Sequence, residues 1–297
     1  AGLWNNRLSF EIAYYNNRSD NQLVGMPLPG ITGFSSISAN LNAVVENSGW
    51  EISLRSVNIK REHFWWNTSF NLTVPRNRLV SFPDLKGSTY ASKYEIGYPL
   101  SIYKLYKLNG VNTETGLFEF EDYNDDGIIT STDDRKFIAD LTPRLYGNIS
   151  NNLRFRNWNL DFLFQFVKKL GLNEYYNTEP PGTKYNQPVG VIDRWQTQGD
   201  QAFMQAYTSG SNYDAYLLHY KFRASDGVIS DASFIRLKSL SVSYKFPFEK
   251  TGSENCVLYI QGQNLLTITK FKNGDPEQLT GFIPPVRRLS FGIRVEL

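Results

Sequence analysis

The 297-residue sequence holds few of the side chains from which enzyme and metal sites are commonly built. Its single cysteine, Cys256, excludes an internal disulfide and offers no cysteine spacing for a metal. The two histidines, His63 and His219, lie far apart with no cysteine near either, which disfavours a zinc site or a histidine-based catalytic set. Carboxylates are plentiful, but no motif pairs two of them as a glycoside hydrolase requires. The sequence therefore predicts a protein that is not an enzyme, and it assigns no catalytic residue.

Long hydrophobic runs are also missing. No apolar stretch approaches the roughly 18 residues that a membrane helix needs, which excludes helical spans but not a membrane barrel, whose alternating strands average out as polar. The formal net charge of +2 gives no argument for a nucleic-acid partner. No signal peptide is visible, and residues 1–15 read as a turn followed by a strand, so we expect the chain to be part of a longer protein.

Aromatic residues, in contrast, are abundant, at 15% of the sequence, and many of them take part in a strict alternation of apolar and polar residues. Such alternation is typical of a β-strand with two different faces. It predicts eight strands, at residues 7–15, 49–56, 64–74, 144–155, 157–166, 234–246, 256–268 and 288–297. Within residues 234–246 the apolar positions switch parity, which predicts a β-bulge near Lys238–Ser239.

The connections between these strands are alternately short and long. The longer segments lie at residues 20–48, 75–143, 169–232 and 270–285. Outer-membrane barrels have this pattern, with tight turns at one rim and extended loops at the other. The polar faces are rich in Asn, Ser, Gln and Thr, as is typical of a water-filled lumen, although a soluble β domain stays open as the alternative. Trp65, Trp66 and Trp158 beside short turns fit either an aromatic girdle at a membrane interface or ordinary strand packing.

Residues 122–134, DYNDDGIITSTDD, match the EF-hand pattern in which oxygen ligands recur around a glycine. The predicted ligands are Asp122, Asn124, Asp126, the backbone carbonyl of Ile128, Thr130 and Asp133. Asp133 stands where glutamate is usual, and Asp134 is an alternative at that position. These hard oxygen ligands favour Ca²⁺ and leave room for Mg²⁺, in a structural role that clamps a long loop. The alternative is a solvated turn without metal, and the pattern allows a short helix at residues 131–138.

Several stretches together carry a resemblance to a known family. They include NAVVENSGWEISL, WWNTSFNLTVPRNRL, GYPLSIYKLYKLNGV, FEDYNDDGIITSTDDRKFI and QNLLTITKFKNGDPE, and they occur in the family's order along the chain. The sequence resembles the C-terminal third of SusC/RagA-type TonB-dependent transporters of the outer membrane. The resemblance implies an all-β fold in which residues 1–297 form the last eight strands of an antiparallel transmembrane β-barrel of about 22 strands with long extracellular loops. The plug domain and the earlier strands would then lie outside this sequence.

The resemblance also implies active import of glycans or oligopeptides across the outer membrane, energised by TonB and assisted by a SusD-like surface lipoprotein. The other expected partners are the remainder of the barrel, outer-membrane lipid and the TonB complex, reached through the missing N-terminal part. The loop aromatics Tyr175, Tyr176, Tyr185 and Trp195 are candidate substrate contacts, although such rings also pack long loops together. Two alternatives stay open: a TonB-dependent receptor for a small chelate or vitamin without a lipoprotein lid, and a secreted β-rich calcium-binding adhesin.

Overall fold

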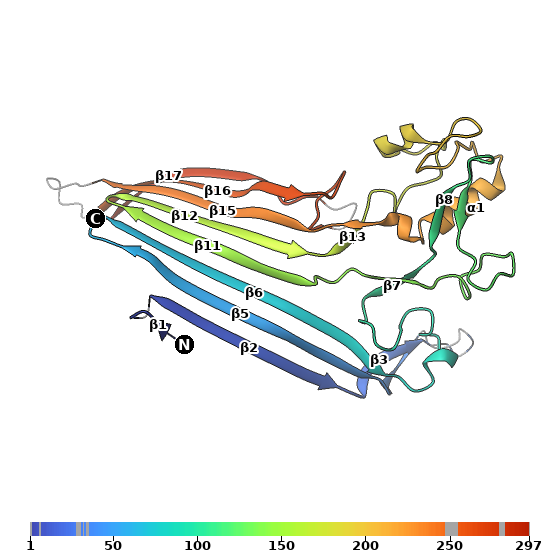
Figure 1. Ribbon diagram of the computed structural model, residues 1–297, viewed down its shortest axis with the longest axis horizontal. Coiled ribbons are helices and arrows are strands. Elements are labelled where there is room, and N and C mark those ends of the chain that lie inside the picture. Colours follow the sequence, from blue (N-terminus) through green and yellow to red (C-terminus); the bar gives the residue numbers. More distant parts are fainter. Residues whose placement is uncertain are drawn as a thin grey trace.

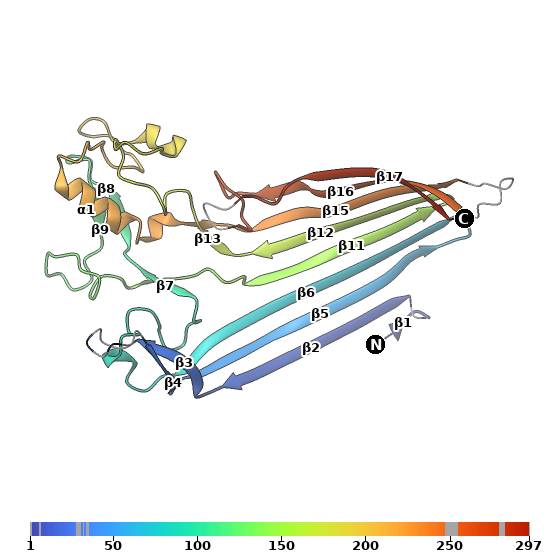
Figure 2. The ribbon, with the colours of Figure 1, turned by 180° about the vertical axis from the view of Figure 1, so that it is seen from behind.

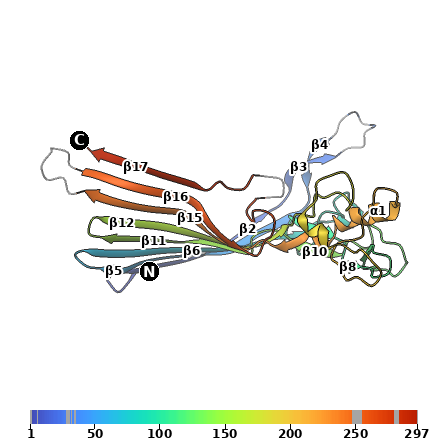
Figure 3. The same ribbon diagram turned by 90° about the horizontal axis from the view of Figure 1, so that it is seen from above.

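The computed structural model describes residues 2–5, 7–27, 31, 33, 36–246, 255–278 and 283–296. Its main feature is one antiparallel sheet, a single layer thick, whose strands follow one another in sequence order (Figures 1 and 3). The strands of this sheet are β1 (Gly2–Leu3), β2 (Leu8–Ser19), β5 (Val44–Lys60), β6 (Phe64–Ser81), β11 (Leu145–Phe155), β12 (Trp158–Lys168), β15 (Phe234–Phe246), β16 (Asn255–Thr269) and β17 (Arg288–Glu296). All but β1 overlap the predicted segments, which confirms the all-β expectation; Leu297, at the end of the last segment, lies outside the described residues.

The register of the sheet gathers apolar side chains on one face and polar side chains on the other. One row of directly paired residues is apolar throughout: Phe10, Leu54, Phe70, Ile149, Phe164, Leu237 and Leu266. The row beside it is polar throughout: Glu11, Ser53, Asn71, Asn148, Gln165, Arg236 and Thr267. Because side chains alternate along a strand, a slip of one residue in any strand would mix the two rows. The period-two pattern therefore excludes register shifts by an odd number of residues.

No described part of the chain covers the middle of the apolar face. Leu266 is 47% exposed and Phe291 is 83% exposed. The buried apolar clusters of the described residues lie at one end of the strands and beyond it, where the long connections fold. Water disfavours an apolar surface of this extent, so the face requires lipid or another apolar partner.

A β-bulge interrupts β15 at the place that the sequence predicts. Leu237 pairs with Phe164 and Ser239 pairs with Leu163, so Lys238 has no residue opposite it in β12. The register with β16 shifts at the same place. The extra residue lets the sequence pattern change parity while the apolar side chains stay on their face.

Two central strands extend further than the alternation indicated, since β5 begins at Val44 and β6 ends at Ser81. β6 pairs with β11 only as far as Thr73, which lies opposite Tyr146. Pro75 therefore lies where β6 has a neighbour on one side only, and a proline, which has no N–H to donate, is tolerated there. The backbone ladder thus continues after the alternation of side chains has stopped.

The two ends of the sheet differ (Figures 1 and 2). At the turn end, connections such as residues 156–157 are short. At the loop end, residues 82–144 and 169–233 fold into small elements, and we call these two segments the loop region. Its elements are η2 (Leu85–Gly87), β7 (Ile102–Leu105), β8 (Leu108–Val111), β9 (Phe118–Phe120), β10 (Phe137–Asp140), β13 (Leu170–Leu172), η3 (Val189–Asp193), α1 (Tyr213–Phe222), η4 (Asp226–Val228) and β14 (Ile229–Asp231), with a further hairpin of β3 (Gln22–Pro27) and β4 (Ser36–Leu41) nearby.

One local expectation is wrong. The sequence allowed a short helix at residues 131–138, but residues 131–133 form a turn and β10 begins at Phe137, where it pairs with β7. None of the helices in the described part of the chain is long and apolar enough to cross a membrane.

Gly147 and Gly262 provide a matched test of strand packing, because both lie on the apolar face and both are buried. A Cβ atom at Gly147 would lie 2.1 Å from the backbone carbonyl oxygen of Asn71, which cannot move without breaking the β6–β11 ladder. At Gly262 the nearest atom, at 2.5 Å, belongs to the flexible side chain of Leu265. In the full-length protein we expect Gly147→Ala to destabilise the barrel by about 1–3 kcal/mol and Gly262→Ala by much less. The measurement is the temperature at which the folded band disappears when gel samples are heated to successively higher temperatures before loading; equal shifts for both variants would contradict the register.

Candidate functional site: the loop region

The loop region has a hydrophobic core of its own. The buried members of this core are Tyr106, Phe118, Phe120, Leu172, Val191, Met204, Phe222 and Val228. The rings of Phe118, from β9, and Phe222, from α1, stack with their centroids 4.3 Å apart. The two segments of the loop region therefore pack against each other and form one folded unit.

A partly buried ion pair joins the same two segments. Lys107 Nζ lies 2.5 Å from Asp226 Oδ2, and the backbone N–H of Leu108 donates to the other carboxylate oxygen. The hydrogen bond to Asp226 raises the pKa of the Lys107 ammonium, against the opposing effect of its partial burial. The carboxylate is thus shared between a charged donor and a backbone donor, which holds β8 beside η4.

The four candidate substrate aromatics lie in different surroundings. The Tyr175 ring is 5.4 Å from that of Phe203 and packs on the core, and burial raises the pKa of its hydroxyl. Tyr176 is also packed on the core. The indole Nε1 of Trp195 donates to the Thr113 carbonyl at 3.0 Å.

Tyr185 differs from the other three, because its side chain is 55% exposed. The Lys184 ammonium lies 5.6 Å from its ring centroid. The structure therefore places Tyr175, Tyr176 and Trp195 in packing positions and leaves Tyr185 accessible to a ligand. The substrate role of all four stays a prediction.

The predicted cation ligands lie in one tight turn. Asp122 accepts hydrogen bonds from the backbone N–H groups of Asn124 and Gly127, and Asp126 accepts one from Ile128 at 2.7 Å. Gly127 has a φ of 80°, which favours glycine at this position of the turn. These bonds hold the carboxylates on one short stretch of backbone.

The side chains of the turn also bond to one another. Asn124 Nδ2 donates to Asp126 at 2.8 Å, and the Thr130 hydroxyl donates to Asp133 at 3.0 Å. Within the described residues, no group of three or more His, Cys, Asp or Glu side chains converges closely enough to hold a metal. The oxygen donors suit Ca²⁺ chemically, and binding would exchange these two side-chain contacts for contacts with the cation.

Asp134, which the sequence offered only as an alternative ligand, has a clear structural role. Its side chain is fully buried and accepts the backbone N–H groups of Tyr123, at 2.9 Å, and Thr130, at 2.6 Å. Both carboxylate oxygens are therefore engaged in closing the turn. Sequence analysis missed this role, because adjacent aspartates at 133 and 134 look alike until burial distinguishes them.

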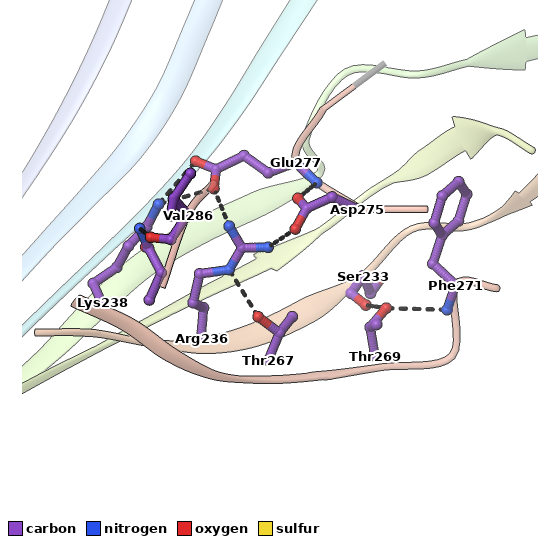
Figure 4. A network of polar contacts seen from close by, with 10 residues as sticks. Ser233, Arg236, Lys238, Thr267, Thr269, Phe271, Asp275, Glu277 and Val286 are labelled. Carbon is purple, nitrogen blue, oxygen red and sulfur yellow. Dashed lines mark hydrogen bonds and ion pairs between the residues drawn. The ribbon is translucent and has the colours of Figure 1, made fainter. Parts of the chain in front are cut away.

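A second set of ionic contacts fastens the segment after β16 to the polar face of the sheet (Figure 4). Arg236, from the polar row, is 1% exposed and donates to Asp275 at 2.5 Å, to Glu277 at 2.7 Å and to the Thr267 hydroxyl at 3.0 Å. Lys238, at the bulge, adds a contact of 2.8 Å to Glu277. Burial by itself would raise the pKa of the Asp275 carboxyl, but hydrogen bonds from Arg236 and from the Glu277 backbone outweigh it and hold that pKa below its ordinary value.

His219 lies on α1 inside the loop region and is fully buried. Its Nε2 lies 2.9 Å from the Thr178 carbonyl oxygen, which can only accept, so this nitrogen carries the proton. Its Nδ1 is buried with no hydrogen-bond partner among the described residues. Burial lowers the pKa of His219 to about 4, helped by the nearby Arg223 charge and opposed by the Thr178 hydrogen bond and by Glu179.

These features together define a class of structure. A one-layer antiparallel sheet with an uncovered apolar face, an amide-rich face, short turns at one end and folded loops at the other is a segment of a transmembrane β-barrel wall.

Comparison with known proteins agrees with this class. No family model matches the chain. It is 29% identical to TonB-dependent receptor P3 of Formosa agariphila over 93% of this chain and 29% of the relative. It is 24% identical to TonB-dependent receptor SusC of Bacteroides thetaiotaomicron over 94% of this chain and 29% of the relative. The homologues of the chain are thus TonB-dependent receptors, SusC among them, and the chain spans less than a third of their length.

Solved structures show the same fold. The RagAB peptide transporter matches 93% of this chain with a TM-score of 0.73 and 24% identity, and the match covers 31% of that protein's chain. The RagAB peptide importer in an open state matches 100% of this chain with a TM-score of 0.74 and 21% identity, covering 33% of its chain. The resemblance to SusC/RagA-type barrels expected from the sequence is confirmed.

The stability of the loop region should depend on pH through His219. Its pKa is 6.5 in the unfolded chain and about 4 in the folded one, so between these values the unfolded state binds more protons. The contribution of His219 to the free energy of unfolding is therefore fully present above pH 6.5 and decreases as the pH drops toward 4. The total loss is on the order of 3 kcal/mol. Hydrogen exchange of α1 in the full-length protein, corrected for intrinsic rates, measures this loss.

His219→Gln keeps a side-chain N–H for Thr178 and should remove the pH dependence. The other histidine is the control: His63 lies at the turn end with its side chain 64% exposed, and His63→Gln should leave the dependence unchanged. A pH response that survives in His219→Gln would show that another group is responsible.

Proposed function

We propose that the receptor containing this chain is an active importer of the outer membrane, energised by TonB, which takes up glycans or oligopeptides together with a SusD-like surface lipoprotein. The observation that carries this proposal is the pair of adjacent rows across the sheet, one apolar and one polar. The apolar row suits contact with acyl chains, and the polar row suits the wall of a wet passage.

Several further observations support import rather than catalysis. The relatives are receptors, and the solved neighbours are a peptide transporter and importer. The polar row consists largely of amides and hydroxyls, which hydrogen-bond to passing solutes without holding them as fixed charges would. The proposal contains no step in which a covalent bond is broken.

The loop region is the part that would meet the substrate and the lipoprotein. It stands beyond the loop end of the sheet, and its packed core gives it a defined surface (Figure 2). Exposed rings such as Tyr185 and Tyr213, which is 71% exposed, are available on that surface. Aromatic rings of this kind stack on sugar faces and pack on peptide side chains.

Import is tested on the complete receptor in its natural host. Deleting the gene should abolish growth on one glycan or peptide source, and a tonB deletion should give the same defect. The receptor should require detergent for solubility and should co-purify with a surface lipoprotein. Purification without a lipoprotein would favour a receptor for a small chelate, and solubility without detergent would favour a secreted adhesin; either result would contradict the proposal.

We also propose that residues 122–133 bind Ca²⁺ in a structural role. The alternating carboxylates and Gly127 support this, because the backbone of the turn already holds Asp122 and Asp126 in place. Sites of this kind in extracellular modules bind Ca²⁺ with a dissociation constant of about 10⁻⁴–10⁻³ M.

The turn supplies its own control for calcium binding. Asp126→Asn removes a predicted ligand charge, whereas Asp125→Asn makes the same change at the neighbouring position, whose backbone φ of 55° asparagine also adopts readily. By calorimetry on the full-length receptor, we expect Asp126→Asn to weaken Ca²⁺ binding at least about tenfold and Asp125→Asn to have little effect. Equal effects of the two variants, or no calcium binding in the parent protein, would leave the turn as a solvated loop.

A further inference from the structure

A cavity of about 880 Å³ opens between the residues around η2 and the residues that follow the predicted cation-binding turn at residues 122–133. The charged residues of its lining are Lys86, Glu95, Lys104, Arg135 and Lys136. Pockets for small ligands commonly have volumes of about 300–1,000 Å³, so the space is sufficient for an oligosaccharide segment.

The lining carries an excess of positive charge. The one carboxylate, Glu95, is engaged with Lys104 Nζ at 2.6 Å, and Lys104 also donates to the Ala91 carbonyl. Lys86, Arg135 and Lys136 have no ion-pair partner among the described residues. Three cations thus line one cavity without an ion pair in the described part of the chain, which favours an anionic ligand.

Arg135 is held in a fixed position. Its guanidinium lies 4.8 Å from the ring centroid of Tyr106, which belongs to the buried core. Its Nε is buried without a hydrogen-bond partner in the described part of the chain, and an unpaired buried donor is costly. A planar guanidinium fixed on a ring is suited to binding carboxylate or sulfate oxygens through two N–H groups.

The other lining groups suit a carbohydrate better than a peptide. The lining contains four Ser and Thr side chains, Thr89, Ser92, Ser131 and Thr132, whose hydroxyls can donate to and accept from sugar hydroxyls, whereas the Ser88 hydroxyl already bonds to the Leu85 carbonyl and the Tyr90 N–H. Tyr98, with its side chain 44% exposed, offers a ring face. Few apolar side chains are available for the hydrophobic residues of a peptide.

Both walls of the cavity are anchored before any ligand arrives. The η2 wall is fixed by Phe82 and Leu85, which are buried in the cluster at the loop end of β5 and β6. The opposite wall is fixed by Asp134, immediately before Arg135, and by the pairing of β10 with β7, in which Ile138 lies opposite Lys104. A preformed site loses little conformational entropy on binding.

We propose that this cavity binds the acidic group of an anionic oligosaccharide, a sulfate or a uronate carboxylate, with Arg135 as the main contact and Lys86 and Lys136 as supporting charges. The proposal rests on the proposed import function and names the substrate class for it.

The test measures binding to the full-length receptor in detergent by calorimetry. The probe is a chondroitin sulfate tetrasaccharide, which carries both sulfate and carboxylate groups. A desulfated form and a carboxyl-reduced form show which of the two groups is bound, and a form with both changes is the neutral control. We expect the charged probe to bind at least about tenfold more tightly than the form that lacks both groups. Tetraglutamate, the acidic peptide control, should bind weakly.

Three variants locate the binding. Arg135→Gln should weaken binding of the charged probe roughly tenfold or more, and Lys86→Gln with Lys136→Gln should weaken it by a similar factor while leaving the core contact with Tyr106 intact. The control is Lys272→Gln, which removes the same charge from an exposed lysine outside the cavity and should leave binding unchanged. The lysine double variant keeps the test decisive if Arg135→Gln does not fold.

The proposal is overturned if the neutral and charged probes bind equally, if the lysine double variant binds like Lys272→Gln, or if tetraglutamate binds as tightly and is lost in the same variants. Import by the same variants separates this inference from the proposed function. If the parent receptor supports TonB-dependent growth but the cavity variants bind the charged probe normally, only the proposed binding site is disproved. If growth with the parent receptor does not depend on TonB, the proposed import function itself is disproved.

Discussion

A single layer of strands has no interior in which to bury side chains, so a sheet of this kind depends on its backbone ladder and on what surrounds its faces. Neighbouring strands of the sheet satisfy each other's N–H and C=O groups, which is the condition for crossing a lipid phase. The row from Phe10 to Leu266 then supplies the apolar surface that acyl chains accept. Among the described strands β17 pairs with β16 alone, so its other edge has unpaired N–H and C=O groups. In lipid such an edge requires another strand beside it.

The loop region follows a different rule, because it buries a core in the manner of a small water-soluble domain. Phe118 and Phe222 stack in its centre, and around them His219 makes a buried polar contact and Asp226 a partly buried one. Its stability therefore responds to proton binding, whereas the stability of the sheet responds to close approach of backbones, as at Gly147. One chain thus combines two units that are stabilised in different ways.

This difference decides how much could be predicted from the sequence. In the sheet every residue has one of two faces, so alternation alone indicates the strands, the face of each side chain and the bulge at Lys238. Where consecutive residues of a strand are all polar, as at residues 76–78 of β6, the alternation ends although the ladder continues. In the loop region the contacts join residues about a hundred positions apart, such as Phe118 and Phe222, and no local period reports them. For the same reason the sequence could not separate Tyr175, which packs on the core, from Tyr185, which is exposed.

The two sites proposed in the loop region share one anchor. Asp134 fixes the turn before it by accepting the N–H groups of Tyr123 and Thr130, and the residue after it, Arg135, lines the cavity. The carboxylates of the turn therefore lie close in sequence to the cations of the cavity, and without a counterion they oppose the approach of an acidic ligand. A cation in the turn would offset that charge while leaving Arg135 in place on Tyr106. Structural calcium and an acidic substrate are thus compatible with each other on electrostatic grounds, because the positive charge that closes the turn also favours the anion beside it.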